Sequence, residues 1–310
     1  MYDVIIIGGG AAGLSAAIYC ARGGMKTLVM EKLATGGQIN NTSEVDNYLG
    51  FSSNPSGEEL AKSFSDHAKK FGVVFATENV KSIENAEYDV KVVHTRRHTY
   101  MTKSIIFATG ANPRPLGAPG EDILRGSGVS YCATCDGTFF KDRVCAVIGG
   151  GNTAFEDAVY LSKLCKQVYL INRSKKFRAA QTLVDQAQRC GNIAIITDTV
   201  CTKFVGEASL SGLDLQNTLT GEKSHLKTDG VIVAIGVIPD SALAKASGVE
   251  LCKDGFIKTD IYMKTNIKGI FAAGDVRTTP LRQIITAAAD GAIAGVSAVN
   301  YVNELGIKSI

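Results

Sequence analysis

The chain repeats one strand, glycine loop, helix and strand pattern, and this repetition limits the folds open to it more than any other feature. Val4–Ile7 is a short apolar run, and residues 8–13 follow it with the spacing G-x-G-x-x-G. An Ala-rich helical segment over 14–22 and a second apolar run over 27–30 complete the first copy. Such a loop lets backbone N–H groups and a helix N-terminus meet a pyrophosphate. The full context predicts a dinucleotide site rather than an ordinary glycine turn.

The same pattern returns near the middle of the chain. A strand is expected over 143–148, a loop with the spacing G-x-G-x-x-A over 149–154, a helix over 155–164 and another strand over 167–171. Where the first copy has Glu31 at the end of its second strand, the second copy has Asn172. Two matched copies predict two nucleotide sites in one chain.

The ends of these two strands indicate different cofactors. A carboxylate such as Glu31 accepts hydrogen bonds from a free ribose diol and repels a 2′-phosphate, which instead attracts Arg or Lys. The second copy lacks the acid and continues with basic residues: Arg173, Lys175, Lys176 and Arg178. A solvated charge run is the alternative interpretation of these residues. We therefore expect FAD in the first copy and NADPH in the second, because a flavin passes electrons from nicotinamide to a disulfide.

A cysteine pair supplies that disulfide. Cys132 and Cys135 have two residues between them and Asp136 directly after them. With this spacing two thiols can close into a small disulfide loop, in which one thiolate attacks and the other resolves the mixed disulfide. Such a pair can also be half of a zinc site, but the other six cysteines include no second close pair. No metal site is predicted.

Later segments define the expected domain order. Residues 103–110 are expected to form a strand that ends in a small-residue turn, and residues 230–236 repeat that pattern. A further strand over 269–275 is expected to end at Asp275, ahead of a long helix from about Ile284. Stretches around 112–115 and 238–240 contain prolines and are expected to be exposed linkers.

The predicted fold class is α/β with two Rossmann-like three-layer nucleotide-binding domains. An FAD-binding domain is expected over 1–112 and 243–310. An NADPH-binding domain over 115–240 is expected to be inserted into it and to carry the cysteine pair.

Composition narrows the function classes. The net charge is only +3 over 310 residues and tryptophan is absent, so no nucleic-acid partner is expected. The first strand begins almost at Met1, and glycines interrupt the apolar stretch, so neither a signal peptide nor a membrane span is expected. The cysteines lack the pattern of a secreted disulfide framework. We expect a cytoplasmic protein.

These motifs resemble those of the low-molecular-weight thioredoxin reductases over nearly the whole chain. The matching segments, in order, are 8–13, 36–38, 45–47, 108–110, 132–137, 149–154 and 271–276. The most specific is Cys-Ala-Thr-Cys-Asp at 132–136, because related disulfide reductases carry their redox pair in the FAD domain. The resemblance implies a homodimeric enzyme that uses NADPH and FAD to reduce the disulfide of thioredoxin. It also implies a rotation of one domain on the other, for which the proline-containing linkers would be the hinge.

The resemblance assigns roles to single residues. Cys135 resembles the cysteine that takes electrons from the flavin, Cys132 the one that attacks thioredoxin, and Asp136 the acid that protonates the departing thiolate. The candidate FAD-binding residues are Gly8, Gly10, Ala11, Ala12, Gly13, Glu31, Lys32, Gly36, Gly37, Gln38, Asn47, Ala108, Thr109, Gly110, Gly274, Asp275, Arg282, Gln283 and Ile284. The candidate NADPH-binding residues are Gly149, Gly151, Asn152, Thr153, Arg173, Lys175, Arg178 and Gly236.

One departure from the family bears on the electron donor. The family commonly has His-Arg-Arg after the second strand of the NADPH domain, whereas this chain has Asn172-Arg173-Ser174, so a hydroxyl replaces one guanidinium. NADH or ferredoxin as donor, and a different disulfide protein as substrate, are therefore alternatives. A flavin reductase of the ferredoxin–NADP type would lack the redox pair, and a nucleotide sensor would bind without catalysis.

Overall fold

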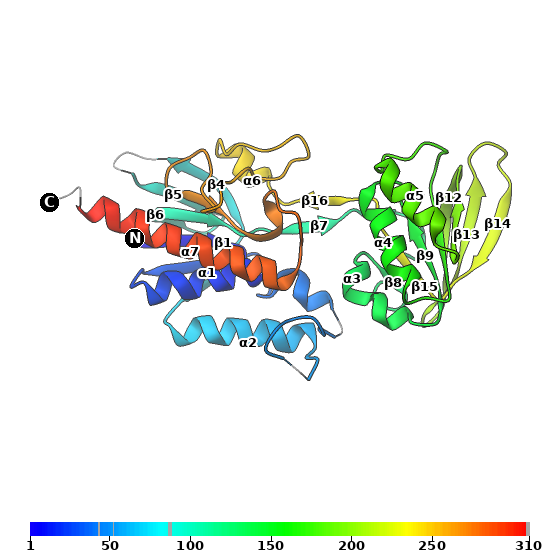
Figure 1. Cartoon of the computed structure of the whole chain (residues 1–310). Helices are drawn as coiled ribbons and strands as arrows, with labels where there is room; N and C mark the ends of the chain where they lie inside the picture. Colours follow the sequence, from blue (N-terminus) through cyan, green and yellow to red (C-terminus); the bar gives the residue numbers. More distant parts are fainter. Residues whose placement is uncertain (43, 52, 86–88, 308–310) are drawn as a thin grey trace. The chain divides into compact units, whose positions relative to one another are not determined.

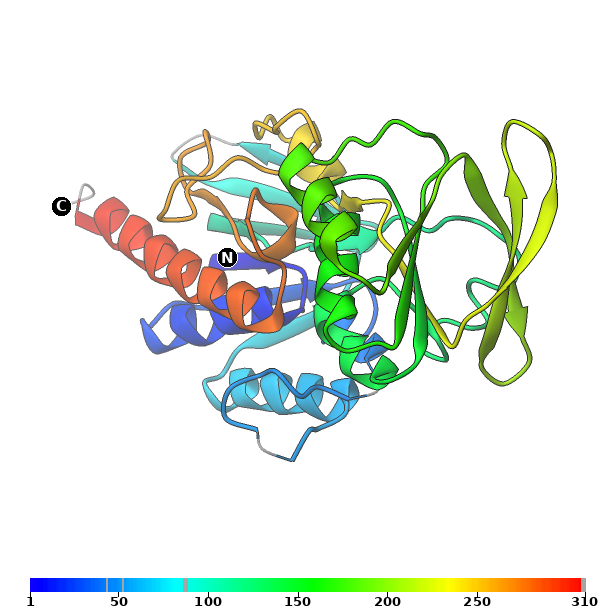
Figure 2. The ribbon, with the colours of Figure 1, turned by 45° about the vertical axis from the view of Figure 1, so that its right-hand side comes forward.

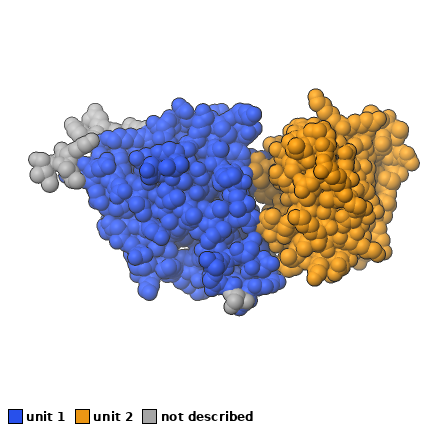
Figure 3. Space-filling view, viewed as in Figure 1, with its two compact units in different colours: residues 1–112, 238–310 blue, residues 113–237 orange. Residues whose placement is uncertain are grey.

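The structure is a computed structural model that describes residues 1–42, 44–51, 53–85 and 89–307. The chain forms two compact units, coloured separately in Figure 3. Unit 1 comprises Met1–Asn112 and Ile238–Ile310, and unit 2 comprises Pro113–Val237. Each unit has its own sheet and its own buried core.

Unit 1 is built on a seven-stranded sheet. Its strands are β1 (Tyr2–Ile7), β2 (Thr27–Glu31), β3 (Val74–Thr77), β4 (Val80–Asn85), β5 (Lys91–Thr95), β6 (Thr99–Phe107) and β17 (Ile270–Ala272). They lie in the order β3-β2-β1-β6-β5-β4, and β17 also pairs with β6. The strands β1, β2, β3, β6 and β17 run parallel, so their carboxyl ends meet at one edge. The strands β4 and β5 extend the sheet in antiparallel pairing.

Two helices of unit 1 pack closely against each other on one face of this sheet. The helices and short turns of unit 1 are α1 (Ala11–Arg22), η1 (Gly37–Asn41), α2 (Gly57–Lys70), α6 (Ala242–Ala246), η3 (Gly274–Val276) and α7 (Ile284–Ile307). In Figures 1 and 2, α7 lies beside α1. A Cβ on Gly291 would stand 2.1 Å from the carbonyl oxygen of Ala12, so only glycine permits this approach. By length and composition α7 could also cross a membrane, a property that core helices share.

Unit 2 combines a parallel sheet with a small antiparallel one. The parallel strands are β8 (Val129–Ser130), β9 (Val144–Ile148), β10 (Gln167–Ile171), β11 (Ile193–Ile196) and β15 (Gly230–Val233), in the order β11-β10-β9-β15-β8. The antiparallel strands are β12 (Thr199–Gly206), β13 (Leu210–Asn217) and β14 (Lys223–Lys227). The helices are α3 (Ala133–Asp136), η2 (Gly137–Phe140), α4 (Asn152–Ser162) and α5 (Gln181–Arg189).

The two linkers are paired strands rather than loops. β7 (Ala111–Pro113) and β16 (Val237–Pro239) form a two-stranded sheet. Hydrogen bonds flank the pair, from the N–H of Asp240 to Gly110 at 3.0 Å and from the N–H of Arg114 to Gly236 at 2.9 Å. Pro113 and Pro239 therefore end short strands that have few backbone donors to satisfy.

The predicted α/β class with two Rossmann-like units is confirmed. One predicted strand was too long, and two ended in turns as expected. The strands within 103–110 and 230–236 end at Phe107 and Val233, and the small residues that follow turn the chain through positive φ at Gly110 and Gly236, as expected. The strand expected over 269–275 spans only Ile270–Ala272, since Gly274 has φ 75° and begins η3.

Candidate active site

Each glycine loop closes tightly at its first position. Gly8 has φ 109°, and a Cβ there would stand 2.2 Å from the carbonyl oxygen of Ala108. In unit 2, Gly149 has φ 155°, and its Cβ would stand 2.4 Å from the carbonyl oxygen of Ala234. Both positions therefore require glycine, because the loop passes against the end of a neighbouring strand.

The second glycine of each loop faces open space instead. A Cβ on Gly10 would meet nothing nearer than the carbonyl oxygen of Gly36 at 3.8 Å, and one on Gly151 would meet no atom within 4 Å. Packing does not require glycine at these positions, and the bare backbone there leaves room for a ligand to approach closely. α1 and α4 begin directly after them, and the N–H groups of a first helical turn have no partner within their own helix. Both loops thus fit the pyrophosphate of a dinucleotide.

Glu31 ends β2 beside the first loop. One carboxylate oxygen accepts a hydrogen bond from the N–H of Gly9 at 2.9 Å, and the other accepts one from the N–H of Leu33 at 3.1 Å. These contacts fix the carboxylate at the carboxyl edge of the sheet and leave acceptor capacity on both oxygens. The geometry suits recognition of a ribose diol.

A half-buried carboxylate and a half-buried guanidinium stand at the β17 end of unit 1. Burial raises the pKa of Asp275 to about 6, although the nearby Arg282 guanidinium opposes this shift. Arg282 lies 4.2 Å over the ring of Phe256, and its Nε has no hydrogen-bond partner among the described residues. An orphaned buried donor calls for a polar partner that the protein does not supply. These side chains therefore fit a polar cofactor.

Other candidate residues of unit 1 are joined by contacts between distant segments. Gln38 donates to Asn112 at 2.6 Å, and Asn47 donates to Gln283 at 3.2 Å. Lys32 forms an ion pair with Asp240 at 3.1 Å. The remaining candidates lie in the same set of loops and turns: Ala11, Ala12 and Gly13 in α1, Gly36 and Gly37 at η1, Thr109 and Gly110 after β6, Gly274 at η3, and Ile284 at the start of α7.

In unit 2, Asn172 organises the loop that follows β10. Its side chain is buried, and its Nδ2 donates to the carbonyl oxygens of Ser174 at 2.6 Å and Lys176 at 3.3 Å. Ser174 turns inward too, since its hydroxyl donates to Lys176 at 3.0 Å. The N–H of Arg178 donates to the carbonyl of Gly150 at 2.7 Å, which joins this loop to the glycine loop.

The cationic side chains of this loop are available for a ligand. Arg173, Lys175 and Arg178 are exposed, and within the described part of the chain none of them forms an ion pair with a carboxylate. Three unpaired cations beside a glycine loop create an anion-attracting surface. The other candidates of this unit, Asn152, Thr153 and Gly236, border the same edge of the parallel sheet. Asn152 accepts a hydrogen bond from the N–H of Ala180 at 2.9 Å.

The redox pair is closed into a disulfide. Cys132 caps α3 at its N-terminus and Cys135 lies within that helix, with Cα atoms 5.3 Å apart. Both cysteines are half-buried, so the disulfide is neither sealed in the core nor fully exposed. The N–H of Asp136 donates to the carbonyl of Cys132 at 3.1 Å, which places the acid in the same turn.

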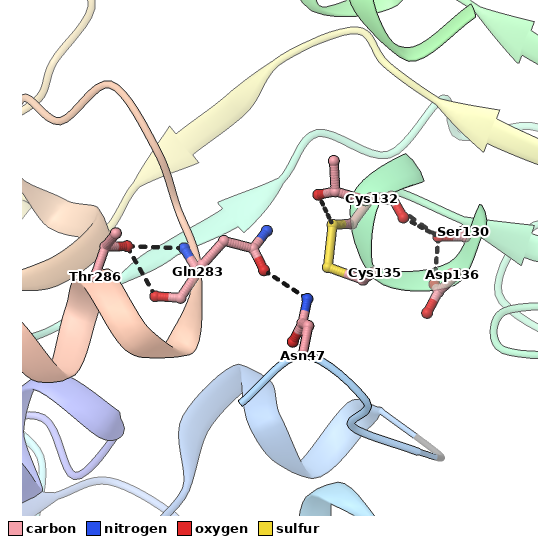
Figure 4. The surroundings of a disulfide bond; sticks show 8 residues. Asn47, Ser130, Cys132, Cys135, Asp136, Gln283 and Thr286 are labelled. Carbon is pink, nitrogen blue, oxygen red and sulfur yellow. Dashed lines mark hydrogen bonds between the residues drawn. A yellow bond between two sulfur atoms is a disulfide. The ribbon is translucent and has the colours of Figure 1, made fainter. Parts of the chain in front are cut away.

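Ser130, which the sequence did not single out, fixes the acid beside the disulfide. Its hydroxyl donates to a carboxylate oxygen of Asp136 at 2.5 Å and accepts from the N–H of Cys132 at 3.1 Å (Figure 4). One hydroxyl therefore holds both the carboxylate and the backbone of the first cysteine. Asp290 of α7 was also missed; it accepts from the N–H of Gly274 at 3.1 Å and pairs with Arg277 at 2.9 Å. Neither a serine at the end of a strand nor an aspartate within a helix gives a distinctive sequence signal.

Comparison with known proteins gives consistent matches over nearly the full length. The family model for pyridine nucleotide-disulphide oxidoreductases matches residues 2–291. A thioredoxin reductase of Listeria monocytogenes is 42% identical over 306 residues, covering 98% of this chain and 95% of the relative. The Bacillus subtilis thioredoxin reductase is 43% identical over 311 residues, covering 98% and 96%. The crystal structure of a Streptococcus pyogenes thioredoxin reductase matches with TM-score 0.92 and 41% identity, covering 98% of this chain and 99% of that one.

Proposed function

Because the chain belongs to the pyridine nucleotide-disulphide oxidoreductases, and within them to the thioredoxin reductases, we propose that it uses NADPH and FAD to reduce the disulfide of a thioredoxin. The observation that carries this proposal is the Cys132–Cys135 disulfide with Asp136 held beside it by Ser130. The same proposal makes thioredoxin the protein substrate in the cytoplasm, with no membrane or nucleic-acid partner.

Unit 1 would hold FAD and unit 2 would hold NADPH. In unit 1, the open face at Gly10, the carboxylate of Glu31 and the unpaired Nε of Arg282 support FAD binding. In unit 2, the open face at Gly151 and the unpaired cations after Asn172 support binding of a 2′-phosphate. When bound, the flavin supplies hydride acceptance from a nicotinamide and delivery of two electrons to a disulfide.

The chain's own residues account for the exchange with thioredoxin. Once the disulfide has gained two electrons and two protons, the Cys132 thiolate attacks one sulfur of the thioredoxin disulfide and forms a mixed disulfide. The Cys132 proton passes to Asp136 as its thiolate forms; the other thioredoxin sulfur departs as a thiolate, and Asp136 gives it that proton. Cys135 then attacks the Cys132 sulfur, which restores the original disulfide and releases the second thioredoxin thiolate, and the proton that Cys135 loses ends on that thiolate. In this scheme Cys135 faces the flavin.

A homodimer is part of the same proposal. Large apolar side chains remain exposed along α7, with Ile285 at 43%, Ile293 at 39% and Val296 at 46%. A second copy of the chain would remove this apolar surface from water. Analytical ultracentrifugation at micromolar concentration should give twice the chain mass of 32.7 kDa. A single species at the chain mass would remove this part of the proposal.

Anaerobic titration of the purified protein tests cofactor and donor together. NADPH should bleach the flavin absorbance at a lower concentration than NADH does, because only NADPH offers a 2′-phosphate to the basic loop. Bleaching by NADH at equal or lower concentration would assign the donor to NADH. Use of NADH would be consistent with Ser174, because its hydroxyl donates to the Lys176 carbonyl oxygen and it has no positive charge to attract a 2′-phosphate.

Cysteine variants test the exchange itself. Cys132→Ser should still pass electrons from NADPH to ferricyanide but should fail with thioredoxin, because the attacking sulfur is gone. Cys190→Ser is the matched control, since Cys190 is a half-buried free cysteine of the same unit. It should keep both activities. Normal reduction of thioredoxin by Cys132→Ser would contradict the role of Cys132 as the attacking cysteine.

A further inference from the structure

A buried carboxylate closes the segment that follows the first linker strand. Glu121 is only 2% exposed, and no cation forms an ion pair with it among the described residues. Its Oε1 accepts from the N–H of Leu116 at 2.8 Å, and its Oε2 accepts from the N–H of Gly117 at 2.6 Å. These donors lie a few residues after β7, so the carboxylate fixes the chain where it enters unit 2.

The same carboxylate also reaches the redox turn. The hydroxyl of Tyr131 donates to Oε1 of Glu121 at 2.8 Å, and Tyr131 directly precedes Cys132. The guanidinium of Arg125 lies 5.0 Å from the centre of the Tyr131 ring. Burial, reinforced by Glu121, raises the pKa of Tyr131 far above its usual value, so the hydroxyl keeps its proton and remains a donor.

Two residues that directly precede Cys132 therefore fix the redox turn, residues 132–136, by separate hydrogen bonds. Ser130 binds the N–H of Cys132 and the carboxylate of Asp136, whereas Tyr131 binds Glu121. We propose that Glu121 is a positioning residue, which ties the redox turn through Tyr131 to the segment after β7. This inference rests on the proposed function, because its value lies in aligning the Cys132 sulfur with an incoming disulfide. A misalignment of about 1 Å can cost roughly 100-fold in rate.

Only a carboxylate meets all three donors at this place. Oε1 accepts two hydrogen bonds and Oε2 accepts one. A glutamine would bring one amide group with a single acceptor, so its NH₂ would face an N–H or O–H donor. Glu121→Gln therefore breaks at least one tie, while Tyr131→Phe removes only the tie to the redox turn and leaves the ring in place.

The test compares two electron acceptors in the FAD-loaded enzyme. Tyr131→Phe should lower kcat for thioredoxin about tenfold with KM within twofold, and Glu121→Gln should lower it further. Reduction of ferricyanide by NADPH should stay unchanged in both variants, because that acceptor does not need the aligned sulfur. Tyr169→Phe is the control, since Tyr169 is half-buried in the same unit and its hydroxyl makes no hydrogen bond within the described chain.

The outcomes separate the inference from the proposed function. If Tyr131→Phe matches Tyr169→Phe in kcat for thioredoxin, the positioning role is wrong. If both activities of Tyr131→Phe fall in parallel, the tie only maintains folding and the role is again wrong. Should the unaltered enzyme fail to reduce thioredoxin, the proposed function fails. The inference is then judged by the rate at which the reduced cysteine pair attacks a small aromatic disulfide, where the same ranking of variants is expected.

Discussion

The two nucleotide loops share one backbone plan but differ in what the side chain after the second strand does. In unit 1, Glu31 accepts hydrogen bonds from the N–H groups of Gly9 and Leu33. In unit 2, Asn172 donates to the carbonyl groups of Ser174 and Lys176. A side chain with oxygens only can hold N–H groups and ribose hydroxyls, whereas an amide can also hold carbonyls. An asparagine in place of the acid therefore has two effects. It removes a charge that would repel a 2′-phosphate, and its Nδ2 donates the hydrogen bonds that fold the basic loop.

Asn172→Asp, which restores an acid at this position, should have the largest effect on the difference between the two loops. The variant loses two donated hydrogen bonds, worth about 1 kcal/mol each, and places a negative charge beside the loop that would bind a 2′-phosphate. We expect kcat/KM for NADPH to fall roughly 100-fold, which corresponds to about 2.7 kcal/mol, while kcat/KM for NADH falls less. Steady-state kinetics with both donors give the ratio.

The chain offers a closely matched control for this change. Asn192 also donates through Nδ2 to two carbonyl oxygens, those of Ser162 at 2.9 Å and Cys165 at 3.1 Å. Asn192→Asp should lower the melting temperature without changing the ratio of NADPH to NADH. If both variants shift that ratio equally, Asn172 has no special role in donor selection.

Alanine at the second glycine should separate the two sites. Gly10 and Gly151 have φ −81° and −98°, which alanine accepts, and an added Cβ meets no close protein atom at either position. We expect an unchanged melting temperature but a rise of about tenfold in Kd, for FAD in Gly10→Ala and for NADPH in Gly151→Ala, because the pyrophosphate loses its close approach. Gly191→Ala, at another open glycine of unit 2, should change neither Kd.

Glu31→Gln should have a smaller effect, confined to unit 1. The amide keeps one acceptor oxygen, so either Gly9 or Leu33 loses a hydrogen bond, at a cost of about 1 kcal/mol. The Kd for FAD, measured by equilibrium dialysis after removal of the flavin, should rise about fivefold while the Kd for NADPH stays the same. Glu58→Gln on the surface of α2 is the control. A change in both constants would mean that the two sites are not independent.

The smallest expected effect concerns the pH dependence of stability. Burial raises the pKa of Asp157 in unit 2 to about 7 and that of Asp275 in unit 1 to about 6. Each carboxyl holds its proton more tightly in the folded chain than in the unfolded chain. The stability that this provides is complete below about pH 4 and is lost as the pH rises through the folded-state pKa. Asp157→Asn should flatten this decline by on the order of 1 kcal/mol, since water still reaches the half-buried side chain.

Thermal unfolding between pH 4.5 and 7.5 checks this difference between the units. The decline that Asp157 causes should extend to about pH 7, whereas the one that Asp275 causes should end near pH 6. Parallel curves for Asp157→Asn and the unaltered protein would show that the Asp157 carboxyl titrates alike in the folded and unfolded chain.

The sequence was sufficient for features that depend on local spacing. The glycine loops, Glu31 and Cys132–Cys135 each lie within one strand, turn and helix pattern, whose geometry the residues themselves dictate. The parallel sheets then brought the loop residues of each unit to one edge. The nucleotide assignments themselves stay predictions.

Contacts that depend on how a loop folds back could not be predicted. Glu121 meets Tyr131 only because the 116–121 segment closes on itself, and Asp290 meets Gly274 only because α7 returns to that turn. The role of Asn172 was seen as a missing acid, since the carbonyls that it holds become neighbours only in the folded loop. Likewise the linkers were predicted from their prolines, but the pairing of β7 with β16 was not.

The pairing of β7 with β16 means that unit 2 could be deleted while the two ends of unit 1 stay close together. Because β7 and β16 run side by side, the chain leaves unit 1 and returns to it at neighbouring points, as the two arms of a hairpin do. A short turn between Asn112 and Ile238 could therefore replace 113–237 with little loop-closure entropy at stake.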